Sequence, residues 1–453
     1  MLVSFSVSNF RSFAEEQTFS MVASNRFDGH TDHLTPIPGT EEKALRLGIV
    51  YGANASGKSN FFKALAYVQR VARETRKKNT GTGREFFRLG NLEGDISEFD
   101  VQFVANNQLY RFGFKVNDQS ILEEWLIRIN GTRESIVYER MTDSQGTVTI
   151  DIRNITTPNE KLKALATIGA PSGQSFLATI WNSPLEMQDV GKEIEAVLFW
   201  FIYQLKLIAP DASFGPLANF MNQNEECLSF SSSFLNAAST GIHRITADKK
   251  EVAFEDVCRD YGEDDVKQFQ DELEDNGSVV LPSIEEGLDI LMEKKDGKDS
   301  FFKFTLQAGH LKQDGQEVAM RFTEESDGTR RLLHLMPALH FLKSTPCVFV
   351  VDEIDRSMHP VLSKKFLEFF IKSGTTSQLI VTTHESNLLD QELVRRDEVW
   401  FAEKNQAEAT HLYSLSDFKV RKDLEIRKGY LQGRFGAIPF LGKIDQLLPE
   451  RPE

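Results

Sequence analysis

The run GANASGKS at residues 52–59 constrains the fold of this 453-residue chain more than any other feature. It follows the apolar segment LRLGIVY at 45–51 and precedes NFFKALAYVQRVARETRKK at 60–78, which has helical periodicity. The run satisfies the pattern G-x-x-x-x-G-K-[ST], which is typical of a phosphate-binding loop when it lies between a strand and a helix. We therefore predict an α/β fold in which this loop joins a sheet edge to a helix.

The loop also predicts contacts with ATP and Mg²⁺. Backbone NH groups of the loop and of the helix N-terminus are expected to surround the β-phosphate. Lys58 is expected to neutralise phosphate oxygens, and Ser59 to bind Mg²⁺. The predicted nucleotide-binding residues here are Gly52, Asn54, Ser56, Gly57, Lys58, Ser59 and Asn60.

Two later segments predict the catalytic half of the same site. CVFVVDEID at 347–355 is an apolar strand that ends in two carboxylates. We expect Asp352 to face the hydrated Mg²⁺ and Glu353 to orient and deprotonate the attacking water. LIVTTHES at 379–386 is expected to deliver His384 to the same sheet edge, where its imidazole can reach the γ-phosphate or the water. A helix-capping or core histidine is the alternative for His384.

ESDGTRRLL at 325–333 predicts a second anion site far from the loop in sequence. A serine hydroxyl, an exposed NH at Gly328 and a helix N-terminus together favour one phosphate group. Because the loop already contacts one side of its own nucleotide, we expect Ser326 and Gly328 to contact the nucleotide of another copy. Two chains would then sandwich two ATP molecules. An ordinary helix N-cap is the alternative for Ser326.

Together these segments resemble the ABC-type ATPase heads of the SMC, RecF and OLD group. The resemblance rests on NFRSF at 9–13 and on GANASGKSN, ESDGTRRLL, VVDEIDRSMHP and TTHESNLLD. With the ending KGYLQGRFGAIPFL at 428–441, the chain is similar to stand-alone AAA-family ATPases of bacterial antiphage operons, such as the PARIS and AbiL ATPase subunits. The resemblance implies a mixed β-sheet with the P-loop, an antiparallel β layer and an inserted region.

The resemblance also implies roles for individual residues. Ser326 and Gly328 become the signature that acts across a dimer, and His384 becomes the switch histidine. Arg11 matches an N-terminal arginine near the phosphates, although a surface arginine at a bend is the alternative. The chain departs from SMC heads at Ala55, where they have glycine, and at His359, where they have an acidic residue. No glutamine is identifiable as the Mg²⁺ sensor.

We predict three regions along the chain. Residues 1–154 form the N-terminal half of the ATPase head, 155–285 a helical insertion, and 286–453 the C-terminal half with the signature, the carboxylates, the switch histidine and a tail. The aromatic run LFWFIY at 198–203 is expected in a core or at a partner interface. The glycine- and aromatic-rich ending either closes the fold or contacts a partner, and we favour the partner.

Composition limits the partners and the compartment. There are 52 Lys and Arg against 67 Asp and Glu, a net charge of −15, which opposes broad attraction to nucleic acid or anionic lipid. Three scattered cysteines and an N-terminus unlike a signal peptide favour a cytoplasmic protein without a membrane partner. The run HTDH at 30–33 suggests a metal site, but a solvated loop is favoured.

These observations predict an ATP-hydrolysing sensor or scaffold subunit of an antiphage, toxin-antitoxin-like system. It is expected to form a homodimer or higher homo-oligomer around ATP, to control a separate effector such as a nuclease, and to respond to a phage protein. No other Asp, Glu and His cluster in the sequence suggests phosphodiester cleavage. One alternative is a RecF- or SMC-like DNA-maintenance ATPase, which the acidic balance disfavours. Another is a transporter ATPase, which the lack of an LSGGQ-like sequence disfavours.

Overall fold

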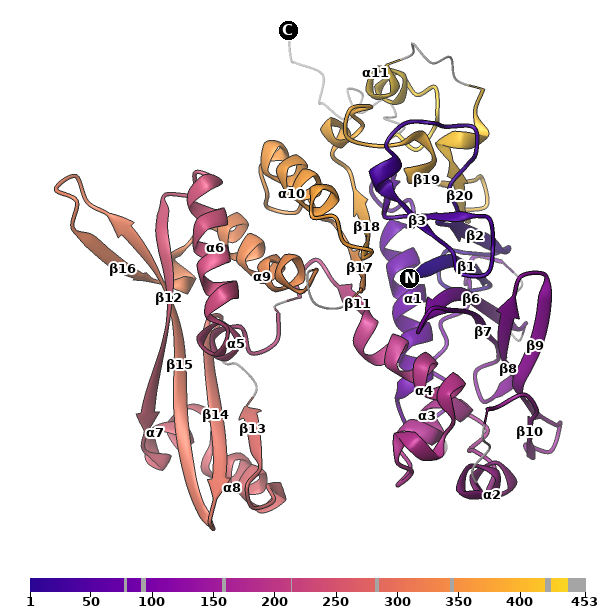
Figure 1. The fold of residues 1–453 in the computed structure, drawn as a ribbon, viewed down its shortest axis with the longest axis horizontal. Helices are drawn as coiled ribbons and strands as arrows, with labels where there is room; N and C mark the ends of the chain where they lie inside the picture. The colour runs from indigo at the N-terminus through magenta and orange to yellow at the C-terminus, as the bar shows by residue number, and fades with distance from the viewer. Residues whose placement is uncertain are drawn as a thin grey trace, which may run out of the picture. The chain divides into compact units, whose positions relative to one another are not determined.

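The computed structural model describes residues 1–76, 80–90, 95–156, 160–212, 214–281, 285–342, 346–419 and 425–438. The chain divides into two compact units. The first unit contains residues 1–210, 344–355 and 364–453, and the second contains 211–343 and 356–363. Figure 1 shows the helices and strands of both units.

A six-stranded mixed sheet forms the centre of the first unit. Its strand order is β11-β17-β18-β5-β19-β20, and only β20 is antiparallel to its neighbour. Every residue of β5, β17 and β18 is buried, as expected for apolar strands that are covered on both faces. The strands are β5 (Leu47–Tyr51), β11 (Leu205–Ile208), β17 (Val348–Val351), β18 (Gln378–Thr383), β19 (Val399–Lys404) and β20 (Thr410–Ser414).

A seven-stranded antiparallel sheet forms the second layer of this unit, in the order β10-β9-β8-β7-β6-β1-β2. Alternating burial along β1 and β6 shows that one face of this sheet meets the core. The predicted antiparallel layer is therefore present. Its strands are β1 (Leu2–Ser8), β2 (Gln17–Ser20), β6 (Ser97–Ala105), β7 (Gln108–Val116), β8 (Ile121–Asn130), β9 (Arg133–Thr142) and β10 (Val148–Ile152). A separate pair joins β3 (Leu34–Pro36) to β4 (Lys43–Leu45).

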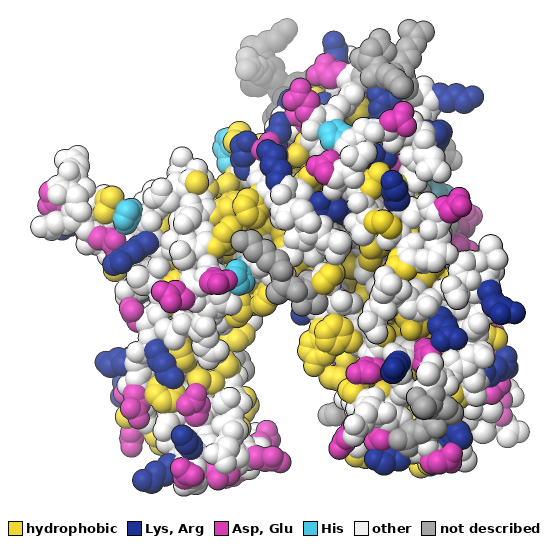
Figure 2. Space-filling view, viewed as in Figure 1, with side chains coloured by type: hydrophobic (Ala, Val, Ile, Leu, Met, Phe, Trp, Pro, Cys, Tyr) yellow, Lys and Arg dark blue, Asp and Glu magenta, His cyan; other side chains and the backbone are white. Residues whose placement is uncertain are grey.

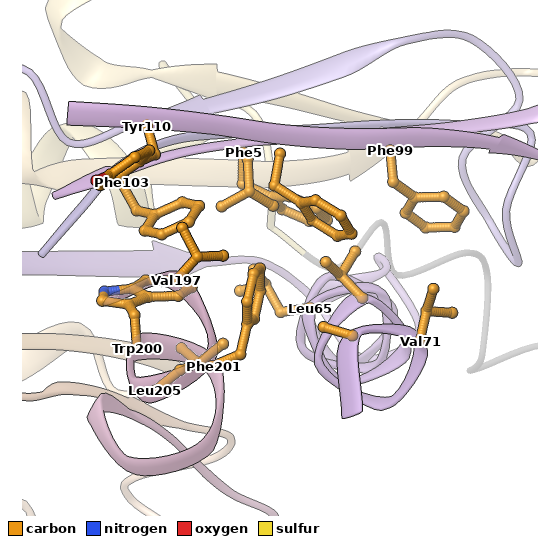
Figure 3. Close-up of a cluster of buried hydrophobic side chains, with 14 of the residues drawn as sticks. Phe5, Leu65, Val71, Phe99, Phe103, Tyr110, Val197, Trp200, Phe201 and Leu205 are labelled. Carbon is orange, nitrogen blue, oxygen red and sulfur yellow. The ribbon is translucent and has the colours of Figure 1, made fainter. Parts of the chain in front are cut away.

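One continuous hydrophobic core connects the two sheets through helix α1 (Lys58–Arg73). Figure 3 shows Phe5 and Phe103 of the antiparallel layer directed toward Leu65 of α1 and toward Trp200. The rings of Phe103 and Trp200 stack with centroids 4.2 Å apart. The helix that begins at the predicted phosphate-binding loop is thus fixed by apolar packing on both sides.

Helices α2 (Glu160–Ile168), α3 (Phe176–Trp181) and α4 (Lys192–Phe199) belong to the first unit, and a π-helical turn at Trp200–Gln204 follows them. Leu198, Trp200 and Phe201 are fully buried, whereas Phe199 and Tyr203 are 46% and 49% exposed, so only part of the run LFWFIY lies in the core. The compact units thus differ from the predicted regions, because the second unit begins at residue 211 instead of 155.

The second unit combines helices with an antiparallel sheet of order β12-β15-β14-β13, in which β16 also pairs with β15. The predicted helical insertion at 155–285 therefore contains helices, but it also contains three strands, β11, β12 and β13, that the sequence analysis missed. The strands are β12 (Ile242–Val252), β13 (Ser278–Leu281), β14 (Leu288–Lys295), β15 (Lys298–Leu311) and β16 (Glu317–Arg321). The helices are α5 (Leu217–Gln223), α6 (Glu225–Ala237), α7 (Phe254–Tyr261), α8 (Glu263–Glu272) and α9 (Asp327–Phe341).

The C-terminal aromatics pack inside the first unit. Tyr430, on α11 (Ile426–Leu431), and Phe435 both stack on Phe401 of β19, with centroids 5.7 and 5.9 Å away. The Tyr413 hydroxyl donates a hydrogen bond of 2.7 Å to the Phe435 carbonyl. Residues 425–438 therefore help to close the first unit, and the partner contact stays a prediction. Helix α10 (Pro360–Lys372) completes the list of helices. Among the described helices, none combines the length and apolar character needed to cross a membrane.

Candidate nucleotide-binding site

The phosphate-binding loop leaves β5 at Tyr51 and enters α1 at Lys58, as predicted. Gly57 has φ +111°, and a Cβ added there would lie 2.1 Å from Thr410 Oγ1, so only glycine fits. Ala55 also adopts a left-handed φ of +63°. This conformation costs alanine about 1 kcal/mol, which explains why glycine is the more usual residue at that point of the loop.

Lys58 lies across the loop and is almost fully buried. Its Nζ donates hydrogen bonds to the carbonyls of Gly52 (2.9 Å) and Ala53 (3.0 Å). Burial lowers the pKa of the Lys58 ammonium to about 8, although nearby carboxylates, Asp352 foremost, oppose this shift. A bound phosphate would favour the charged form, so this lysine is suited to an anion.

Asp352 and Glu353 follow β17 and are held by the neighbouring strand. The Thr382 hydroxyl of β18 donates a hydrogen bond to Asp352 Oδ1 and accepts one of 2.8 Å from the Glu353 backbone NH. Asp352 and Thr382 are both buried. Glu353 has φ +50°, which turns the chain sharply at the strand end. Thr382 was not predicted, although it stands two residues before His384 in a strand that was.

His384 lies beside the loop lysine, with its Nδ1 3.3 Å from Lys58 Nζ. Burial, and then the positive charge of Lys58, lower the pKa of the imidazole. The ring is therefore neutral near pH 7, and because Nδ1 accepts from the ammonium, the proton lies on Nε2. A neutral imidazole with one N–H can donate a hydrogen bond to a phosphate oxygen. The structure thus brings together Lys58 and His384, which lie far apart in the sequence.

A polar cluster behind the loop fixes its position. The Thr410 hydroxyl donates to the Ser56 carbonyl (2.9 Å) and lies 2.8 Å from Ser12 Oγ. Ser12 Oγ also accepts a 2.8 Å hydrogen bond from Asn60 Nδ2. Asn60 was predicted to bind nucleotide, yet its amide contacts Ser12. Thr410 lies outside the predicted motifs and Ser12 belongs to NFRSF, but no role at the loop was predicted for either residue.

The other predicted residues of the first unit lie at or near the loop. Asn54 is exposed and Ser59 is half-buried on the first turn of α1. Arg11 lies at the bend of the predicted hairpin with φ +52°, where its guanidinium pairs with the Glu85 carboxylate and its NH donates to the Glu85 carbonyl at 2.7 Å. The described contacts of Arg11 are thus those of a surface arginine, the alternative considered from sequence.

The predicted signature belongs to the second unit. Ser326 is the N-cap of α9, since its Oγ accepts from the Thr329 NH at 3.2 Å. A Cβ added to Gly328 would lie 2.3 Å from the Ser357 carbonyl, so this position also requires glycine. Ser357 belongs to the DRSMH segment and has φ +59°. The N-cap role is therefore present, and the role across a dimer stays a prediction.

The strand, loop and helix around Lys58, with the acidic strand end beside them, define an α/β P-loop domain. Residues 49–149 and 206–390 match the family described as "AAA domain, putative AbiEii toxin, Type IV TA system". These residues make up more than half of the chain, which therefore belongs to this AAA-domain family. The predicted AAA-type membership is confirmed.

Similar solved structures include two SMC heads. The SMC head domain from Thermotoga maritima is 12% identical, with 91% of this chain and 98% of that chain covered and a TM-score of 0.37. The SmcHead bound to the C-winged helix domain of ScpA is 14% identical, with 91% and 97% covered and a TM-score of 0.37. No curated protein matches the sequence. The family assignment rests on the sequence match.

Proposed function

We propose that the chain is the ATP-binding and ATP-hydrolysing sensor or scaffold subunit of a bacterial antiphage system. The observation that carries the proposal is the contact between Lys58 and His384 beside Asp352 and Glu353, which Thr382 holds. The acidic pair follows β17, His384 follows β18, and Lys58 follows the loop after β5. These three strands are parallel neighbours in the sheet. Such a set suits phosphoryl transfer to water.

The residues present fit ATP with Mg²⁺. Lys58 bonds only to carbonyls and a neutral imidazole among its printed partners, so its charge remains available to an anion. The buried Ser56 hydroxyl makes no hydrogen bond to a described residue and can donate to a phosphate oxygen. Ser59 and Asp352 offer the oxygen ligands that Mg²⁺ prefers. When bound, Mg²⁺ supplies positive charge at the phosphate oxygens.

Each side chain then has one task in hydrolysis. Lys58 binds the β- and γ-phosphates, and Glu353 orients a water and takes its proton. His384 donates its Nε2–H to the γ-phosphate or to that water. Thr382 keeps the carboxylate of Asp352 and the backbone of Glu353 in place, so it is a positioning residue.

The signature supports a dimer in which each nucleotide contacts two copies. Ser326 and Gly328 begin α9, where backbone NH groups and the helix dipole favour an anion. We propose that this helix end contacts the γ-phosphate bound by a second copy. ATP binding would then control assembly, and hydrolysis would release it.

The defence context rests on the family description, which names a putative toxin of a type IV toxin-antitoxin system. We propose that this chain controls a separate effector, such as a nuclease, and that a phage protein is the trigger. The similarity of its motifs to PARIS and AbiL ATPase subunits supports the same role. Direct action on DNA is less favoured, because Figure 2 shows basic side chains interspersed with acidic ones on the face drawn.

ATP turnover by purified variants tests this function. Lys58→Ala should lose ATP binding, whereas Glu353→Gln should bind ATP and hydrolyse it at least about 100-fold more slowly. Lys63→Ala and Glu134→Gln are matched controls, because both residues are exposed. Equal turnover by wild type and Glu353→Gln would contradict the proposed base.

A further inference from the structure

The HTDH segment is only in part the solvated loop that the sequence favoured, because Thr31 and Asp32 are exposed but His33 is buried. His33 is only 2% exposed, and His30, Asp32 and His33 line a cavity of about 240 Å³ in the first unit. One potential ligand atom from each of these three residues lies within 4.8 Å of the others. Glu368, Asp390 and Glu392 line the same cavity. Two imidazoles and several carboxylates therefore converge at one place.

Both imidazoles are oriented through their second ring nitrogen. His33 Nδ1 lies 2.7 Å from Oε1 of the buried Glu398, and His30 Nε2 lies 3.0 Å from the Gln391 carbonyl. A carbonyl only accepts, so His30 Nε2 carries the proton and Nδ1 keeps its lone pair. In the same way, a bond from Nδ1–H to the Glu398 carboxylate leaves the lone pair of His33 on Nε2. Metal-binding histidines are held in this manner by an outer carboxylate or carbonyl.

Two buried arginines fix the backbone of the segment. Arg46 donates from Nη1 to the Asp32 carbonyl (2.9 Å), and its own NH donates to the His33 carbonyl (2.8 Å). Arg395 donates to the carbonyls of Phe27 (3.2 Å) and Gly29. His30 is held at φ +53°, which a histidine adopts only when its surroundings determine it. The three side chains are thus presented by a fixed backbone.

We propose that His30, Asp32 and His33 form a binding site for a divalent transition metal, with Zn²⁺ as the favoured ion. Two imidazole nitrogens and one carboxylate are a common zinc ligand set, completed by water. Tetrahedral zinc at ordinary bond lengths separates its ligand atoms by about 3.4 Å. The three ligand atoms must therefore move slightly closer together. Rotation of the exposed Asp32 side chain can bring its carboxylate toward the imidazoles.

Charge and position around the site agree with a structural ion. Lys364 also lines the cavity, but its ammonium is paired with Asp390 at 2.5 Å; Lys372 and Glu392 are further charged residues of the lining. All three ligands come from the segment before β3, and the hydrogen bond of His33 to Glu398 joins this segment to the chain that enters β19. This site is separate from the residues proposed to act on ATP, so either proposal can fail alone.

Titration of the EDTA-treated, nucleotide-free full chain with ZnCl₂ tests the site. We expect one equivalent to bind with micromolar or tighter affinity and to raise Tm. His30→Ala and Asp32→Asn should each weaken binding at least about tenfold. His243→Ala, an exposed histidine, and Asp352→Asn should leave it unchanged. The buried His33 is left intact because its replacement would also disturb Glu398.

CoCl₂ provides a second readout that does not depend on stability. Bound Co²⁺ should show visible ligand-field absorption in wild type and in His243→Ala, and this absorption should be lost in His30→Ala. The proposal is overturned if neither metal binds, or if His30→Ala and Asp32→Asn bind as wild type does. ATP turnover by His30→Ala should stay at the wild-type rate in either case.

Discussion

The Thr382 hydroxyl donates a hydrogen bond to Asp352 Oδ1 across the parallel strands β18 and β17. Because the same hydroxyl accepts from the Glu353 NH, one side chain sets both the carboxylate and the turn of the acidic pair. Removing it would take one hydrogen bond from the buried carboxylate and one from the partly buried NH, which costs about 1–3 kcal/mol for each group.

Thr382→Val should therefore lower both ATP turnover and stability. The substitution keeps the shape of the side chain but removes the hydroxyl, so we expect turnover to fall at least about tenfold and the free energy of unfolding to fall by about 2 kcal/mol. Urea unfolding and an ATPase assay measure the two effects. Thr382→Ser keeps the hydroxyl and should retain most activity; wild-type turnover by Thr382→Val would show that the hydroxyl does not position the site.

Gly57→Ala should abolish ATP binding. An added methyl group would meet Thr410 Oγ1 at 2.1 Å, and the backbone has a positive φ. Gly146 offers a matched control, since its φ is +83° but nothing lies within 4 Å of an added Cβ. Gly146→Ala should lose only about 1 kcal/mol of stability and should bind ATP normally. If both variants bind a fluorescent ATP analogue equally, the loop is less constrained than its contacts indicate.

ATP affinity should fall as the pH rises above 8. Burial places the pKa of Lys58 at about 8, and the charged form is the one that attracts phosphate. Above that pH the lysine must take up a proton to bind, so Kd should rise toward tenfold per pH unit. Titration calorimetry in buffers of different ionisation enthalpy measures both Kd and proton uptake.

The same shift has an opposite consequence for folding. The folded chain binds fewer protons at Lys58 than the unfolded chain between about pH 8 and the ordinary lysine value. The contribution of this group to stability should therefore rise with pH within that window. Lys58→Arg stays charged throughout, so any affinity that it retains should not change from pH 7 to 9. A flat wild-type Kd over this range would contradict the assigned pKa.

Ser326→Asp separates the capping role of Ser326 from a phosphate contact. Aspartate is as good an N-cap as serine, so Tm should hardly change. Its negative charge should repel a γ-phosphate, and turnover should fall at least about tenfold if one binds there. Ser326→Asn caps without charge and should remain active. Unchanged turnover in Ser326→Asp would assign Ser326 to capping alone.

The sequence predicted the parts of the site that lie in local motifs. The loop before Lys58, the acidic strand end and His384 each stand next to a recognisable apolar strand. The contact between Thr410 and Ser12 could not be predicted, because it joins segments almost 400 residues apart and no pattern marks Thr410. The start of the second unit at residue 211 could not be predicted for a related reason: helical periodicity shows that α2–α4 form, but not which core they join.

The apolar C-terminal segment shows the same limit. Its aromatics gave a correct expectation of burial, but burial against β19 and burial against a partner have the same signature in sequence. The structure shows burial against β19, in the stacking of Tyr430 and Phe435 on Phe401. The burial of His33 was missed likewise, since the partners that orient the two histidines, Gln391 and Glu398, lie more than 350 residues away.

Mixing two inactive variants tests the central claim, that Ser326 acts on the nucleotide of another copy. Lys58→Ala lacks a working P-loop but keeps its signature, and Ser326→Asp has the reverse defect. In a mixed dimer one composite site is intact, so ATP turnover should reappear, at up to roughly a quarter of the wild-type rate for random pairing. If no mixing ratio restores turnover although each variant alone is folded, the signature does not act across a dimer.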